Sequence, residues 1–139
     1  MYALHTVSFL AGNWASPAAT HVRYVGLSTS APNAMLGNYI VKAPVGGVVR
    51  AAYVTAKAGT VGTAEAWTCA LMVVSTAYTI QSLESTDDPR VWSNANLAAP
   101  VHKGDALCLR FTRPATWATP AANVEVSGII AIRSLVRGT

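Results

Sequence analysis

The stretch that decides the fold runs from Val101 to Arg133 and reads VHKGDALCLRFTRPATWATPAANVEVSGIIAIR. Its beginning, His102–Asp105, predicts a tight turn, because glycine adopts positive φ at little cost and aspartate hydrogen-bonds to nearby backbone. The residues that follow alternate between large apolar side chains and smaller or polar ones, which predicts a half-buried β-strand. We expect the core face of this strand to carry Leu107, Leu109 and Phe111.

A second strand is predicted at the end of the stretch, over Asn123–Arg133. Pro114 and Pro120, on either side of Trp117, predict a long loop before it, because proline lacks the N–H that a sheet needs. The same alternation assigns a core face to this strand. That face is expected to carry Val124, Val126, Gly128, Ile130 and Ile132.

The rest of the chain consists of short strand-like segments separated by glycine, proline and asparagine, without a sustained helical period. We expect strands at Tyr2–Leu10, His21–Leu27, Tyr39–Ala43, Val48–Lys57, Ala66–Ser75, Tyr78–Leu83 and Val91–Leu97. Closely spaced short strands predict an all-β protein, a single-domain antiparallel jelly-roll sandwich of about eight strands. An immunoglobulin-like sandwich is the alternative.

The composition favours a protein whose surface is partly hidden in an assembly. The chain has 139 residues, of which 52% are hydrophobic and only 12% are charged. A typical soluble domain has roughly 25% charged residues. Large apolar areas on a protein surface are typical of interaction sites.

Charge and hydropathy argue against nucleic acid and membrane as partners. The net charge is +4 and the pI is near 9.4, but the cations are scattered and form no basic stripe. No window approaches the roughly 18–20 apolar residues that span a bilayer. The first ten or so residues lack the basic start and apolar run of a signal peptide. We therefore expect a chain made in a cytoplasm.

The sequence carries no pattern typical of an enzyme, a metal site or a cofactor site. His5, His21 and His102 are not spaced as metal ligands. Asp87 and Asp88 precede a proline and are typical of a turn. A Gly-x-Ser-x-Gly motif and a phosphate-binding glycine loop are both absent. We expect no catalysis, no metal and no cofactor.

The two cysteines are predicted to be free thiols on opposite faces of their strands. Cys69 shares a face with Trp67 and Leu71, which predicts a place in the core. Cys108 alternates with Leu107 and points away from the core, where we expect only a partner subunit to screen it. Cysteines so placed cannot reach the Cα separation of roughly 4.4–6.8 Å that a disulfide needs.

Candidate interface residues come from the outward face of the last strand. If Ile130 faces the core, Ile129 and Ala131 share the opposite face with Ser127, and Tyr53 is expected to join them. Burying such a patch stabilises by about 25 cal/mol per Å² of apolar area. These four residues are therefore the predicted oligomer interface.

Two aromatic residues are candidate partner contacts. Trp14 and Trp117 fall in or near predicted loops, as does Trp92. Tryptophan is enriched at protein interfaces and also stacks on sugar rings. An interface or core position is favoured over a sugar-binding one.

An ordered set of short motifs resembles the small jelly-roll virion proteins of tailed bacteriophages, which are similar to the trimerising fold of tumour necrosis factor and C1q. The motifs that carry the resemblance are Asn13 with Ser16-Pro17, Tyr24 and Gly26, then GVVRAAYVTAK, AGTVGTAE, VHKGDALCLRF, Trp117–Pro120 and Asn123–Gly128. The resemblance covers about residues 12–133, and such proteins serve as capsid decoration proteins, head fibres or tips of tail fibres.

The resemblance implies a homotrimer in the virion. The function expected first is a decoration or cement protein that contacts the major capsid protein or other virion proteins on the capsid surface. Residues 1–17 and 134–139 would then be extended arms that clip onto neighbours, because termini become ordered when something ties them down. The alternative is a receptor-binding tip of a tail or head fibre that recognises a host-surface glycan through Trp14 or Trp117.

Overall fold

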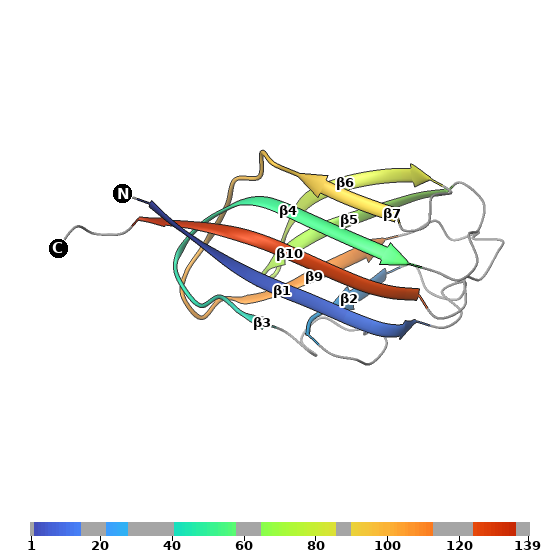
Figure 1. Cartoon of the computed structure of the whole chain (residues 1–139). Coiled ribbons are helices and arrows are strands. Elements are labelled where there is room, and N and C mark those ends of the chain that lie inside the picture. Colours follow the sequence, from blue (N-terminus) through green and yellow to red (C-terminus); the bar gives the residue numbers. More distant parts are fainter. Residues whose placement is uncertain are drawn as a thin grey trace.

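Ten β-strands form two antiparallel sheets packed face to face in the computed structural model (Figure 1). The structure describes residues 2–14, 22–27, 41–57, 65–85, 90–112 and 124–135. The strands are β1 (Tyr2–Trp14), β2 (Val22–Val25), β3 (Val41–Lys42), β4 (Gly47–Lys57), β5 (Glu65–Val73), β6 (Thr76–Ser85), β7 (Arg90–Asn94), β8 (Ala99–Val101), β9 (Ala106–Thr112) and β10 (Val124–Leu135).

The strand order is that of a jelly roll, as predicted. Sheet A has the order β1-β10-β4-β7, and β8 also pairs with β4. Sheet B has the order β2-β9-β5-β6, and β3 also pairs with β9. Because β2 and β3 share one partner, and β7 and β8 share another, the ten strands occupy the eight positions of a double-sheet jelly roll.

The alternation read from the sequence is confirmed on the two deciding strands. Leu107, Leu109 and Phe111 on β9 are buried, as are Val126, Gly128, Ile130 and Ile132 on β10, whereas the side chain of Val124 lies outside the described residues. Gly128 has a specific role among them, because a Cβ at this position would come within 2.8 Å of the Leu109 side chain from the opposite sheet. The missing side chain therefore allows sheet B to pack closely on the centre of β10.

Several strand bounds differ from those expected. β1 continues to Trp14, so residues 2–14 of the expected N-terminal arm lie in sheet A, paired with β10. Residues 134 and 135 likewise belong to β10, whereas 15–17 and 136–139 lie outside the described residues. The sequence did not indicate β8, because Pro100 interrupts its pattern; proline is tolerated there at the margin of the sheet.

Three aromatic residues from both sheets form the largest packed group in the core. Trp92 of β7 lies 5.2 Å from Phe111 of β9 in an edge-to-face arrangement and 6.2 Å from Trp67 of β5, measured between ring centroids. The Trp92 indole Nε1 donates a buried hydrogen bond of 3.0 Å to the Trp67 carbonyl oxygen. Trp92 was predicted to lie in a strand near a loop, at an interface or core position, and its side chain is fully buried between the sheets.

Both lateral edges of the sandwich are closed by hydrogen bonds between the sheets. At one edge, Gln81 of β6 accepts a bond from the Ser93 backbone N–H, and Asn94 of β7 donates to the Ile80 carbonyl. At the other edge, the Leu10 N–H of β1 donates to the Gly26 carbonyl beside β2. These bonds tie the two sheets together at their lateral edges.

The cysteines are both free and both buried. Cys69 lies in the core as predicted, and burial raises the pKa of its thiol strongly. Cys108 alternates with the core residues of β9 as predicted, but only 1% of it is exposed within the isolated chain. The expectation that only a partner subunit screens it was therefore wrong. Burial raises the pKa of Cys108 from 9.0 to about 11, although the positive charge of Arg110 acts in the opposite direction.

We expect neither thiol to react in the native protein at neutral pH, because both are buried and protonated. Labelling with a thiol reagent should be slow until the chain unfolds and should then reach both cysteines without a reductant. Because the folded pKa of Cys108 is raised, its stabilising contribution is present below pH 9.0 and is lost as the pH rises towards about 11. Rapid labelling of Cys108 in the folded Cys69→Ala variant, where Cys108 is the one remaining thiol, would contradict this prediction.

Val74 is strained at the two-residue turn between β5 and β6. Its φ is +56°, and it is the non-glycine residue with positive φ in the described part of the chain. A β-branched residue in this region is destabilised, and two-residue hairpin turns with positive φ at the first position normally use glycine there.

We expect Val74→Gly to stabilise the isolated protein by roughly 0.5–1 kcal/mol, after allowing for the greater flexibility of glycine in the unfolded chain. Urea unfolding followed by circular dichroism measures the difference. The matched control is Ser75→Gly in the same turn, which relieves no positive φ and should leave stability unchanged or lower it. A Val74→Gly variant less stable than the wild type would show that the turn is not strained.

Candidate functional site

The outward side of sheet A collects most of the exposed large apolar side chains. Seven such residues occur in the described chain, and five of them lie on the outward side of β1, β10 and β4. These five are Tyr2 (58% exposed), Leu4 (69%), Leu10 (40%), Tyr53 (51%) and Ile129 (41%). We call the outward side of these three strands the assembly face.

The register of the strands brings the four predicted interface residues onto this one face. Ile129 of β10 is the direct neighbour of Tyr53 on β4, and Ser127 and Ala131 follow at alternate positions of β10. Across β1, Ser8 lies opposite Ile129. The four residues therefore form one continuous area, with Ile129 and Tyr53 at its centre.

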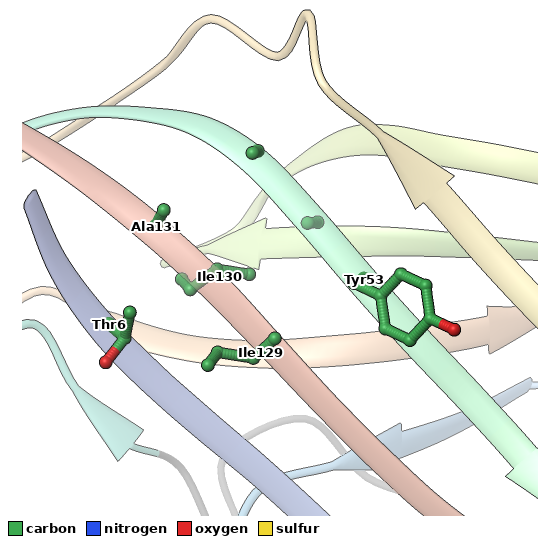
Figure 2. Close-up of a pocket in the computed structure, with 7 residues that line it drawn as sticks. Thr6, Tyr53, Ile129, Ile130 and Ala131 are labelled. Atoms are coloured by element: carbon green, nitrogen blue, oxygen red, sulfur yellow. The ribbon is translucent and has the colours of Figure 1, made fainter.

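A shallow apolar hollow of about 200 Å³ lies in the middle of the assembly face (Figure 2). Ala51 and Ala131 are neighbours across β4 and β10, and their short side chains leave the floor open. Thr6, Tyr53 and Ile129 stand around it. The hollow has the size and chemistry to accept an apolar side chain from a second surface.

Charged residues occupy the two ends of the assembly face. Lys57 and Glu125 are direct neighbours at the end where β4 finishes and β10 begins. At the opposite end, Arg50 and Arg133 line a second hollow, and the Arg133 guanidinium lies 3.6 Å from the centre of the Tyr2 ring. The centre of the face is thus apolar and its charges lie at the ends, as in many protein interfaces.

Sequence reasoning missed three apolar residues of this face, Tyr2, Leu4 and Leu10. They lie at alternate positions of β1, and this segment was predicted to be a strand. Thr6 and Ser8 interrupt the apolar alternation, and residues 1–17 were also interpreted as an arm, so the three side chains were not assigned to the interface. Pairing of β1 with β10 places these side chains beside Ile129 and Arg133.

The side chains of the two candidate aromatic contacts lie outside the described part of the structure. Trp117 is not among the described residues, and of Trp14 only the backbone, paired with Val124, is described.

The described residues bring together no group of three or more histidine, cysteine or carboxylate side chains that could hold a metal ion. Asp105 instead supports its own turn, accepting a 2.8 Å hydrogen bond from the His102 N–H, with the imidazole Nδ1 3.7 Å away. Within the same part of the chain, no helix is long and apolar enough to cross a membrane.

Comparison with known proteins identifies the fold. No family model and no curated protein matches the chain. Among solved structures, it is similar to a chain of the cyanophage Pam1 capsid asymmetric unit, with a TM-score of 0.58 over 96% of this chain and 86% of that chain. The two sequences are 13% identical, so the likeness is one of fold.

Proposed function

We propose that this chain is a structural virion protein of a tailed phage, a homotrimer that decorates and cements the capsid. The observation that carries the proposal is the assembly face, where five of the seven exposed large apolar residues of the described chain lie together. The similarity of fold to a chain of a phage capsid asymmetric unit supports the virion as its location.

The energetics favour association through this face. Covering a large apolar side chain that is half exposed stabilises by roughly 1 kcal/mol, so five such residues per copy supply several kcal/mol towards association. The exposed apolar residues lie on this face, so packing through it buries more apolar area than packing through the lateral edges. In the proposed trimer, an apolar side chain of one copy fills the Ala51–Ala131 hollow of the next.

The number of copies follows from the resemblance of the sequence motifs to trimerising jelly rolls. The proposed role is mechanical and involves no catalytic step. Trimers that bridge neighbouring capsid subunits stabilise the shell by the area they bury, in the way that any ligand binding only the intact state stabilises it.

The test of the assembly face is Ile129→Glu. The new carboxylate would be desolvated at the centre of the buried face, which costs several kcal/mol, so the trimer should dissociate to monomers that remain folded. Light scattering after size-exclusion chromatography gives the mass, and circular dichroism reports the fold. The matched control is Thr79→Glu, which adds the same charge at an exposed strand position of β6 in sheet B and should leave the trimer intact.

The cement role is measured on particles. Capsids of the phage that encodes this chain, prepared without it, should open at a higher temperature after the wild-type protein is added back. Ile129→Glu should restore little of that gain. A wild-type protein that is monomeric at micromolar concentration, or that has no effect on capsid opening, would refute the proposed function.

A further inference from the structure

One end of the sandwich is positively charged. It is the end where β1 begins and β10 finishes, on the left of Figure 1 beside the two chain termini. Four cationic residues gather there: Lys42 on β3, Arg50 on β4, Lys103 in the β8–β9 turn and Arg133 on β10. We call this end of the molecule the cationic end.

Backbone contacts hold these residues at one end although they are far apart in sequence. The Ala43 N–H donates to the Asp105 carbonyl and the Gly104 N–H to the Ala43 carbonyl, which joins Lys42 to the Lys103 turn. Gly47 has a φ of +155°, and a Cβ there would collide with the Arg133 carbonyl oxygen. Glycine at this position therefore lets the start of β4 lie directly against β10.

The charge of this end is not neutralised within the described residues. Its one carboxylate, Asp105, is engaged with His102 in its own turn. At the opposite end of the sandwich, a cation and a carboxylate are paired among the described residues, with Lys57 beside Glu125. The two ends of the sandwich therefore differ in charge.

An exposed apolar residue lies at the cationic end. Val74 is 53% exposed, and its backbone N–H bonds to the carbonyl of Ala106, the β9 residue whose other neighbour is Lys42. Its φ of +56° costs stability that glycine would avoid. Strain of this kind clusters at functional sites, so the retention of valine here indicates a use for its side chain.

We propose that the cationic end is the capsid-docking surface, with Val74 as its apolar anchor and an acidic area of the shell protein as its partner. This inference rests on the proposed function and adds the orientation of the chain. The assembly face joins copies to one another, while Lys42, Lys103 and Val74, which lie off that face at the cationic end, contact the shell; Arg50 and Arg133 lie where the two surfaces meet. Acidic protein is favoured over nucleic acid because an apolar residue with charges around it fits a protein interface, whereas a duplex requires a longer basic track.

The experiment measures binding of the wild-type trimer to shells prepared without this chain, by sedimentation at increasing salt. We expect Lys103→Glu and Lys42→Glu, each placed away from the assembly face, to keep the trimer and weaken shell binding by roughly tenfold or more. The matched control, Thr79→Glu, adds a negative charge on sheet B, away from both surfaces, and should bind as the wild type does. Wild-type binding should weaken as salt rises from about 0.05 to 0.5 M, because exposed charge interactions are screened.

Val74→Gly gives an independent readout. The variant should bind shells more weakly although the isolated protein is more stable, a combination that a purely structural role of valine would not produce. Unchanged shell binding by this variant would remove Val74 from the docking surface.

The remaining outcomes separate this inference from the proposed function. Shell binding that the Lys42 and Lys103 variants leave intact would place docking elsewhere on the molecule; this overturns the inference and leaves the cement role standing. A wild-type trimer that does not bind shells overturns both. Binding of a short DNA duplex at about 0.15 M salt, lost in Lys103→Glu, would identify nucleic acid as the partner and overturn the acidic-protein assignment.

Discussion

The contact on which the rest of the structure depends is the one between Trp92 and Trp67. The Trp92 Nε1–H donates to the Trp67 carbonyl oxygen inside the core, and Phe111 packs edge-to-face against the Trp92 ring. An indole N–H in this position costs free energy unless it is bonded, so the bond fixes the spacing and register of sheet A on sheet B. The Arg90 guanidinium, 5.0 Å from the centre of the Trp67 ring, covers the cluster from the end of β7.

With the two sheets fixed, the surfaces left for binding are limited by the geometry of the jelly roll. The first and last strands are neighbours in sheet A, so the outward sides of β1 and β10 form one area together with β4. The inter-sheet bonds from Gln81 and Asn94 and from Leu10 occupy the lateral edges. The described chain then offers two surfaces for binding: a broad face with apolar residues on β1, β10 and β4, and an end with cations on strands and on the β8–β9 turn.

Strand alternation was enough to predict the fold class, the core faces of β9 and β10 and the common face of Tyr53, Ser127, Ile129 and Ala131. It did not predict features that depend on pairing between distant strands. Cys108 alternates out of the main core yet is buried within the single chain. The cationic end was not recognised for the same reason, since pairing between strands distant in sequence brings Lys42, Lys103 and Arg133 to one end of the sandwich.

The two surfaces rely on different forces, and this difference gives the proposed assembly an order. In that assembly, association through the apolar face would depend on burial of Leu4, Tyr53 and Ile129 and be little affected by salt, whereas docking through Lys42 and Lys103 would be screened by it. The proposed trimer would thus form independently of the shell. It would present three cationic ends to the shell, so that contacts too weak to hold one chain would act together at a high effective concentration. A modest number of cations per chain would then suffice for the proposed cement role, because association through the apolar face triples their number.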